Sequence, residues 1–278
     1  MRHWITAGFI NEKENKTLEE VAEGYFTELV SRSLLQVVKR NHTGRLKCCQ
    51  VHDIIRLVAL NKAGEECFGK VYDGSGAFSI EHTRRISIQS GNLQRLIESD
   101  ATHVRAIHVF NRYINNDLLR PILESSNLLL TLDLQGTRIK MLPTEVFNLF
   151  NLRYLGLRYT NIESLPEDIG KLQNLEVLDA VNSALSYLPN NIAKLQRLRY
   201  LFASYALVGI LKDGAIGTFF VPKHEVFCLQ MHANLSFPLQ RTGTGADPGL
   251  GHAQGPGCYS GLYSVTAVSL QCAVFYSR

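Results

Sequence analysis

A twelve-residue pattern recurs three times in this chain at a fixed interval of 23 residues. The copies read LDLQGTRIKMLP from Leu132, LGLRYTNIESLP from Leu155 and LDAVNSALSYLP from Leu178. Other columns keep the same interval, namely Ile139, Ile162 and Leu185; Leu142, Leu165 and Leu188, each followed by proline; and Leu149, Leu172 and Leu195. Several columns in one register indicate structural units that stack, because a single short unit cannot bury its own apolar face.

Each unit predicts a short strand, a turn and a convex segment. We expect strands at 131–135, 154–158, 177–181 and 200–204, with alternate side chains facing inward and outward. The Leu-Pro step turns the chain, because proline cannot extend a strand, and a short helix is expected after it. Hydroxyls are expected to satisfy backbone groups inside the stack at Thr137, Thr160 and Ser183. A period of about 20–29 residues with L-x-x-L-x-L spacing is typical of a leucine-rich-repeat solenoid.

The outward side chains of these strands would line the concave face of the solenoid, which is the surface that repeat proteins use to bind partners. We therefore predict a protein-binding surface made of Asp133, Gln135, Tyr154, Arg158, Val177, Asp179, Tyr200 and Phe202. Residues 127–205 carry 8 basic and 7 acidic side chains. This balance argues against a groove that tracks the phosphates of a nucleic acid.

The first 66 residues alternate helix and strand signals. Thr17 and Glu20 have the spacing of a capping box at the start of an amphipathic helix. Segments 34–38 and 45–51 predict a β-hairpin, and Asp53 is placed to be the N-cap of a further helix. A helix, a two-stranded wing and another helix predict the end of a winged-helix domain. Its helix LEEVAEGYFTEL is acidic, so we expect no binding to nucleic acid.

His52 and Asp53 are the one pair that suggests chemistry. Because they are adjacent in the sequence, their side chains diverge and do not form a catalytic dyad. The chain has no nucleophile motif, no G-x-x-x-x-G-K-[ST] loop and no C-x-x-C pair, so we predict no catalytic residues, no enzymatic activity and no metal site. Two interpretations stay open for the pair: a helix cap preceded by a histidine at a strand end, or a histidine that contacts a nucleotide phosphate held by an adjoining domain.

The domain organisation predicted from these patterns is an α/β chain in four stretches. They are a winged helix at 1–66, a Gly-rich linker at 67–81, leucine-rich repeats at 82–205 and an irregular or disordered tail at 206–278. Segments 82–89 and 103–110 are expected to be irregular early units of the array. After Leu201 the repeat register stops without a polar capping unit, which leads us to expect a truncated or altered gene product.

Composition restricts the setting of the protein. The 278 residues carry a net charge of +4, which by itself says little about partners. The N-terminus lacks the apolar region of a secretory signal, and the longest apolar run falls short of the about 20 residues that a membrane span requires. The six cysteines are scattered, which suits a reduced, intracellular protein better than a disulfide scaffold. We expect a cytoplasmic protein without a membrane span.

Two unrelated signatures occur in an order typical of one family. The segments HWITAGFI, KTLEEVAEGYFTELVSRSLLQVV and CQVHDIIRLVAL resemble the winged-helix end of the nucleotide-binding (NB-ARC) module of plant intracellular disease-resistance receptors. QVHDIIR resembles the Met-His-Asp motif of that family, with Val51 in place of methionine. The GTRIKMLP type of repeat resembles the leucine-rich domain of the coiled-coil subclass. The resemblance covers roughly residues 1–205.

The resemblance implies a role in innate immunity. In the family the motif histidine contacts the β-phosphate of ADP, which implies His52 as the nucleotide-sensing residue and Asp53 as its local support. It further implies that the repeats keep the switch closed, against the NB-ARC surface, and sense a pathogen effector or a guarded host protein. The phosphate-binding loop would precede Met1, so we expect no ATP hydrolysis and no tight binding of ADP or ATP to this chain alone. The alternative is a leucine-rich-repeat adaptor without a nucleotide role.

Overall fold

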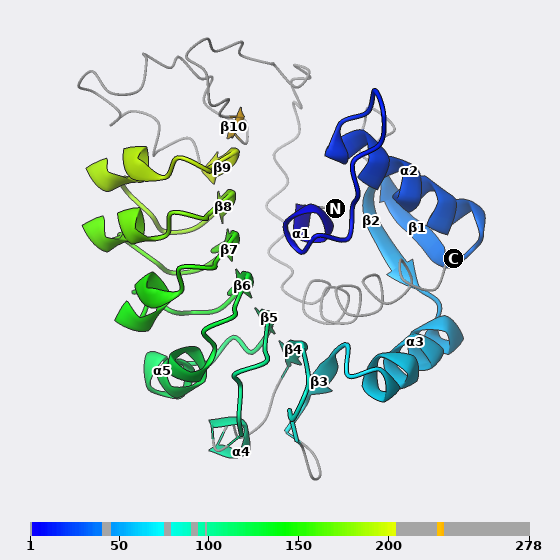
Figure 1. The fold of residues 1–278 in the computed structure, drawn as a ribbon, viewed down its shortest axis with the longest axis horizontal. Coiled ribbons are helices and arrows are strands. Elements are labelled where there is room, and N and C mark those ends of the chain that lie inside the picture. The colour runs from blue at the N-terminus through cyan, green and yellow to red at the C-terminus, as the bar shows by residue number, and fades with distance from the viewer. Residues whose placement is uncertain are drawn as a thin grey trace, which may run out of the picture.

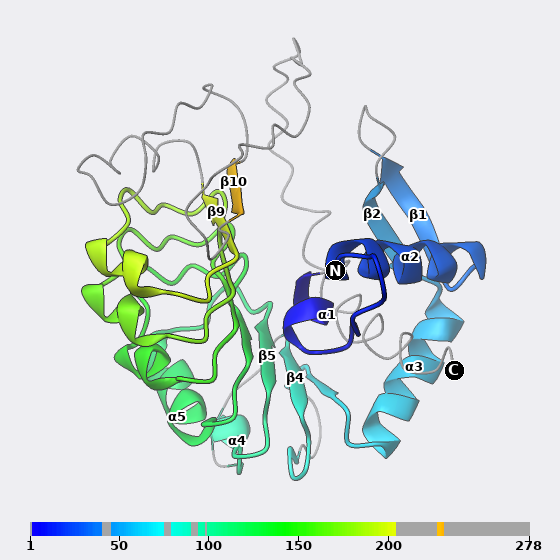
Figure 2. The same cartoon turned by 45° about the horizontal axis from the view of Figure 1, so that its top comes forward.

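The computed structural model describes residues 2–40, 46–74, 79–89, 94–97, 99–203 and 227–230. Its described part has two bodies, a small N-terminal domain of helices and a hairpin, and a curved stack of repeats. Figures 1 and 2 show the strands of the stack along the inner side of an arc, with helical segments on the outer side and the N-terminal domain facing the hollow.

The N-terminal domain has the predicted winged-helix elements. They are α1 (Arg2–Thr6), α2 (Leu18–Ser31), β1 (Leu35–Arg40), β2 (Leu46–Val51) and α3 (Asp53–Glu65). The capping box is confirmed, because the Thr17 side chain accepts from the Glu20 N–H and the Glu20 carboxylate accepts from the Thr17 N–H. The hairpin is confirmed as an antiparallel pair of β1 with β2. Trp4, Val21 and Leu29 lie in the apolar core that joins α1, α2 and the hairpin.

The N-cap of α3 differs from our expectation. The cap is His52, not Asp53, because His52 has an extended backbone and its Nδ1 accepts from the Ile54 N–H at 3.4 Å. Asp53 is instead the first residue of the helix. Its carboxylate there is favourable to the partial positive charge of the helix N-terminus.

The repeats form one continuous sheet with the order β10-β9-β8-β7-β6-β5-β4-β3 among the described residues. The strands from β3 to β9 are parallel, and β10 is antiparallel to β9. Their bounds are β3 (Lys70–Tyr72), β4 (Arg85–Ile88), β5 (Ala106–Val109), β6 (Thr131–Asp133), β7 (Tyr154–Gly156), β8 (Val177–Ala180), β9 (Tyr200–Ala203) and β10 (Phe227–Gln230). The register places repeat on repeat, since Leu132 pairs with Leu155 and Leu155 with Leu178.

The columns of the sequence are columns in space. The inward leucines of the strands are completely buried, and the hydroxyls of Thr137, Thr160 and Ser183 each donate at 2.8 Å to the carbonyl oxygen three residues earlier. These bonds confirm the predicted role of the hydroxyl column. Two of these carbonyls, those of Leu134 and Ala180, also accept from the N–H of Thr137 and Ser183, so the hydroxyl supplies a second hydrogen bond there.

The convex side carries short helices, as predicted, and in the regular units these are 3₁₀ helices. After α4 (Gln94–Ile97) and α5 (Asn116–Ser125), the regular units carry the five-residue 3₁₀ helices η1 (Thr144–Asn148), η2 (Glu167–Lys171) and η3 (Asn190–Lys194). Pro143, Pro166 and Pro189 are their N-caps. Only a few residues separate the Leu-Pro turn from the next strand, so a short 3₁₀ helix makes the connection in each unit.

Two strands lie in stretches for which we predicted none. β3 falls within 67–81 and is the first parallel strand of the sheet, and β10 falls within 206–278 and covers the edge of β9. The remainder of 206–278 lies outside the described residues, as do parts of 67–81. Within the described part of the chain, no helix is both long and apolar enough to cross a membrane.

Replacing Leu155 with aspartate should unfold the repeat stack. Leu155 is completely buried in the middle of the leucine column, and an unpaired buried charge costs about 3–5 kcal/mol. Denaturant unfolding followed by circular dichroism measures this loss. Met141→Asp is the control, because Met141 is 66% exposed. Similar unfolding free energies for the two variants would show that the assignment of inward faces is wrong.

Candidate functional site

The predicted concave residues are brought together on one face of the sheet. Asp133, Tyr154, Val177, Asp179, Tyr200 and Phe202 lie on strands β6 to β9, while Gln135 and Arg158 follow β6 and β7. Gln135 and Arg158 are half-buried, but the other six are buried. Tyr154, Val177, Val181, Tyr200 and Phe202 form an apolar cluster of their own, separate from the leucine core.

Helix α1 lies against this face, in the hollow of the arc (Figures 1 and 2). The Arg2 guanidinium carbon lies over the Phe202 ring, 3.9 Å from its centroid, and 5.8 Å from the centroid of Tyr200. The His3 ring lies on Tyr154 with a centroid distance of 3.9 Å. Cation–π contacts of this kind are strongest where the pair is desolvated.

The next helix adds contacts to β9. The Tyr200 hydroxyl donates to the Glu19 carboxylate, and Arg199 forms an ion pair with the same carboxylate at 3.6 Å. Trp4 and Ile5 are buried and pack in the core of the N-terminal domain. Helix α1 therefore uses Trp4 and Ile5 for its own domain and Arg2 and His3 for the repeats.

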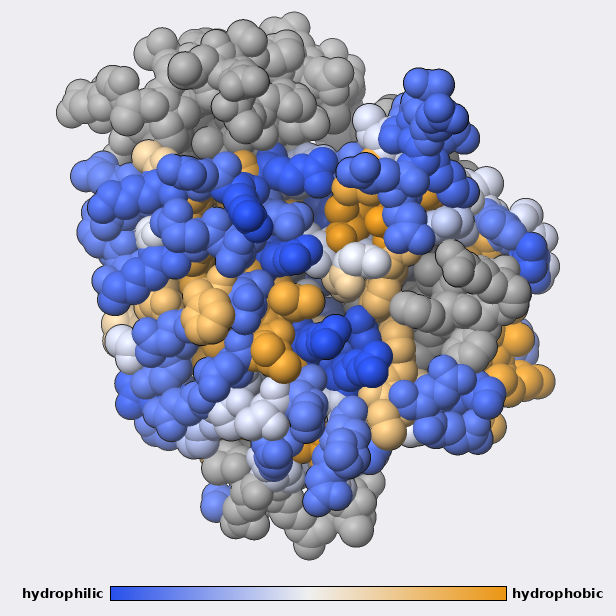
Figure 3. Space-filling view, viewed as in Figure 1, coloured by the Kyte–Doolittle hydropathy of each residue, from blue (hydrophilic) through white to orange (hydrophobic). Residues whose placement is uncertain are grey.

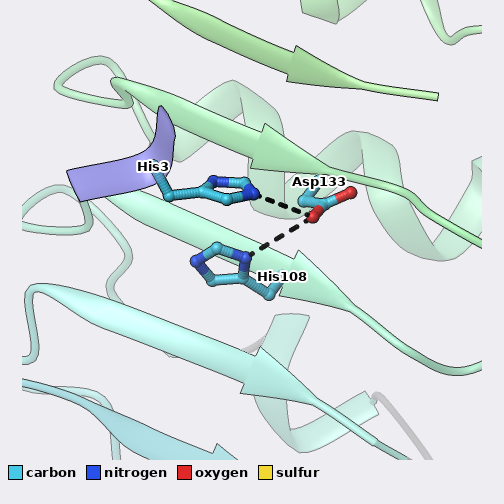
Figure 4. A group of neighbouring side chains, drawn as sticks. All are labelled: His3, His108 and Asp133. Carbon is cyan, nitrogen blue, oxygen red and sulfur yellow. Dashed lines mark ion pairs between the residues drawn. The ribbon is translucent and has the colours of Figure 1, made fainter. Parts of the chain in front are cut away.

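Three polar side chains meet where α1 crosses the sheet, as Figure 4 shows. His3 Nε2 is 3.4 Å from Asp133 Oδ2, and His108 Nδ1 on β5 is 3.9 Å from the same oxygen. The other oxygen, Oδ1, accepts from the Gln135 N–H at 3.1 Å. Gly156 leaves room for this carboxylate, because a Cβ at that position would lie 2.4 Å from Oδ1.

The electrostatics of the group follow from burial and charge. Burial opposes ionisation of Asp133, but the His108 and His3 imidazoles outweigh it and hold the pKa of the carboxyl far below its usual range. Burial lowers the pKa of His3, and Asp133 acts in the opposite direction. The group therefore places an imidazole whose pKa is lowered by burial beside a carboxyl whose pKa is held low by the imidazoles. His3, His108 and Asp133 are residue types that can hold a metal ion.

A second buried carboxylate, that of Asp179, lies on β8, two strands from Asp133 on β6. Asp179 forms an ion pair with Arg158 Nε at 3.1 Å and accepts from the Val181 N–H at 3.4 Å. Burial raises the pKa of the Asp179 carboxyl, and Arg158 only partly opposes this. Arg158, which we predicted to act in partner binding alone, therefore also compensates a buried charge.

His52 and Asp53 lie on a different surface, at the start of α3. Both side chains are exposed. Ile54, Leu57 and Val58 on the same helix are also exposed, at 66%, 61% and 58%, and Figure 3 shows hydrophobic surface at this edge of the molecule. An exposed apolar stripe on a helix is typical of a surface that another domain covers.

The contacts that α1 makes were not predicted. Arg2, His3 and Glu19 lie outside the repeats, and the contacts that they make with the sheet are seen only when the two domains are placed together. His108 lies in the early unit 103–110, where it pairs in register with Asp133. One hint was present in the sequence: the outward strand positions include Tyr154, Val177, Tyr200 and Phe202, which are more apolar than a solvated face requires.

Comparison with known proteins gives two family matches. Residues 1–59 match the model described as "Disease resistance protein Winged helix domain", and residues 103–214 match the model "Leucine-rich repeat region". The chain is 33% identical over 166 residues to the disease resistance protein PIK6-NP of Oryza sativa subsp. japonica, which covers 56% of this chain and 15% of that protein. It is 34% identical over 154 residues to the disease resistance protein RPM1 of Arabidopsis thaliana, which covers 55% and 17%.

The solved structures that resemble the chain are leucine-rich-repeat proteins. One is a protein of Leptospira interrogans, with 18% identity, a TM-score of 0.35 and coverage of 43% of this chain and 36% of that one. Another is the repeat ectodomain of a plant membrane receptor kinase from Arabidopsis thaliana, with 24% identity, a TM-score of 0.33 and coverage of 44% and 15%. These likenesses are too partial to support a structural argument.

Replacing Phe202 with alanine should loosen α1. The change removes the ring beneath Arg2, and a cation–π contact contributes about 0.5–2 kcal/mol, so the protected amides of Ala7 and Phe9 at the end of α1 should exchange about 2- to 30-fold faster. Hydrogen exchange followed by mass spectrometry measures this rate. Lys13→Ala is the control, because it removes a cation–π pair with Tyr25 inside the N-terminal domain. Equal exchange in both variants would contradict the docked position of α1.

Proposed function

Because the chain belongs to the plant disease-resistance proteins, with their winged helix followed by leucine-rich repeats, we propose that it forms the sensing part of an intracellular immune receptor. It spans about 15–17% of the length of the curated relatives that it matches. The nucleotide-binding part of the switch would be supplied by sequence outside this chain. The role of the chain itself is to couple partner binding on the repeats to the position of the winged helix.

The observation that carries this proposal is the contact of α1 with the concave face. The surface on which a protein partner would bind is covered by Arg2 and His3, and its aromatic residues contact them. A partner that binds Tyr154 and Phe202 must displace α1. Binding of the partner and release of the winged helix are then linked. The partner lowers the affinity of the concave face for α1 by the same factor by which α1 lowers its affinity for the partner.

The partner proposed for the concave face is a protein, either a pathogen effector or a guarded host protein. Leucine-rich repeats present extended surfaces suited to proteins, and the aromatic residues Tyr154, Tyr200 and Phe202 are of the type that supplies binding energy in protein interfaces. No catalytic role is assigned to this surface. We place the receptor in the cytoplasm.

The nucleotide role is assigned to His52. Its position beside the exposed apolar stripe of α3 supports an adjoining domain on that side, and a histidine there would reach a phosphate of ADP or ATP bound by that domain. Asp53 supports the helix start. A charge-assisted contact of this kind contributes about 1.5–3 kcal/mol, so the chain alone would hold a nucleotide weakly.

A leucine-rich-repeat adaptor without a nucleotide role is the second candidate. It is favoured by one observation, which is that the His52 imidazole already has a structural task as the N-cap of α3. In that case the winged helix would serve as a protein module, and α1 would still compete with a partner for the concave face.

The substitution His52→Asn separates the two candidates. Asparagine keeps a side chain that caps the helix but removes the imidazole, so folding is preserved while phosphate contact is lost. In the chain joined to the upstream nucleotide-binding module of a relative, ADP retention after gel filtration should fall by about 10- to 150-fold. Glu65→Gln at the other end of α3 is the control. Equal retention in wild type and His52→Asn would leave only the adaptor role.

A further inference from the structure

His3, His108 and Asp133 form a compact group of metal-type ligands at the junction of α1 with the repeat sheet (Figure 4). One ligand atom from each residue lies within 4.8 Å of the other two. The three residues come from α1, β5 and β6. His108 and Asp133 are register partners on neighbouring strands, and His3 joins them only when α1 is docked on the concave face.

The spacing of these atoms fits ligands around one ion, because the 3.4 Å contact would be a long hydrogen bond and the 3.9 Å contact lies beyond hydrogen-bond length. Both imidazole nitrogens face Asp133 Oδ2, at 3.4 Å and 3.9 Å, whereas N–H···O hydrogen bonds are about 2.7–3.2 Å long. Around a tetrahedral Zn²⁺ with bonds of about 2.0–2.2 Å, neighbouring ligand atoms are about 3.4 Å apart. Small side-chain movements would bring the three atoms to that geometry.

Hydrogen bonding also fails to account for the buried imidazoles. His108 is 1% exposed, and its far nitrogen, Nε2, has no hydrogen-bond partner among the described residues. The far nitrogen of His3, Nδ1, is likewise buried and without a partner in the described part of the chain. A metal ion held by the near nitrogens, His3 Nε2 and His108 Nδ1, would offset part of the cost of burying the imidazoles, while the far nitrogens would still lack partners among the described residues.

The carboxylate is held ready for a ligand role. Asp133 Oδ1 is occupied by the Gln135 N–H, which leaves Oδ2 directed toward the two histidines. Gly156 provides the space in which the carboxylate lies, since a Cβ there would collide with it. Contacts of this kind orient metal ligands before the ion binds.

We infer that His3, His108 and Asp133 bind a divalent transition-metal ion, Zn²⁺ by its chemistry, and that this ion fastens α1 to the repeats. Two imidazoles and one carboxylate suit Zn²⁺, which would complete its coordination with water. Mg²⁺ and Ca²⁺ prefer sets of oxygen ligands. The site does not depend on the proposed immune role, and it makes the position of the winged helix sensitive to metal.

The test measures Zn²⁺ binding to the full chain by isothermal titration calorimetry after treatment with a chelator. Wild type should bind one ion that Asp133→Asn and His3→Gln each weaken by at least about tenfold. His3 is 26% exposed in its side chain, so His3→Gln should fold even if Asp133→Asn does not. His82→Gln is the control, because His82 and His103 form an exposed pair of imidazoles with ring centroids 5.7 Å apart.

Two further readouts separate this site from other ligands. Bound Co²⁺ should show the visible absorption of a tetrahedral site without the near-ultraviolet band of thiolate ligation, which excludes the cysteines. Addition of Zn²⁺, but not Mg²⁺, should slow hydrogen exchange at Ala7 and Phe9 in wild type and not in His3→Gln. The inference is overturned if wild type and His3→Gln bind Zn²⁺ equally, if His82→Gln abolishes binding, or if wild type binds none.

Discussion

The structure depends on the stacking of inward leucines along a parallel backbone ladder. Each repeat is too small to bury its own apolar side chains, so Leu132, Leu155 and Leu178 are dry only because the neighbouring units cover them. The hydroxyl column at Thr137, Thr160 and Ser183 donates hydrogen bonds to backbone carbonyls inside the stack. With the leucines fixed inward, the alternation of a strand forces the remaining side chains onto the concave face. That face then carries the candidate binding residues.

The N-terminal domain covers the concave face because the apolar residues of that face are more stable when they are shielded from water. Tyr154, Val177 and Phe202 form an apolar cluster that water would otherwise contact, and Arg2 and His3 lie over its aromatic rings. Asp133 and Asp179 add buried carboxylates, of which the first lies beside His3 and His108 and the second pairs with Arg158. The same combination of aromatic and charged groups that makes the face suitable for a protein partner also makes it hold α1. The proposed partner would therefore compete with α1 for this face.

The repeats and the winged helix could be predicted from the sequence because their signals are local and periodic. The Leu-Pro turns and the capping box each act within a few residues, and the interval of 23 residues repeats along the chain. All three are present in the structure. The contacts between the domains could not be predicted in this way. His108 is placed beside Asp133 by the strand register, but His3 is 105 positions from His108 and shares no motif with it, so no spacing rule brings His3 to Asp133. The Asp53 cap was wrong, because a histidine with an extended backbone performs the task one residue earlier.

The central claim is that α1 lies in the hollow of the repeat sheet, and a nuclear Overhauser measurement between the His3 and Tyr154 rings tests it most directly. Their centroids are 3.9 Å apart, and selective isotope labelling of histidine and tyrosine isolates the signal. We predict a cross-peak between the two rings that is as clear as the one between Tyr200 and Phe202 within β9, whose centroids are 6.0 Å apart. A spectrum that contains the Tyr200–Phe202 cross-peak and lacks the His3–Tyr154 cross-peak would contradict the account.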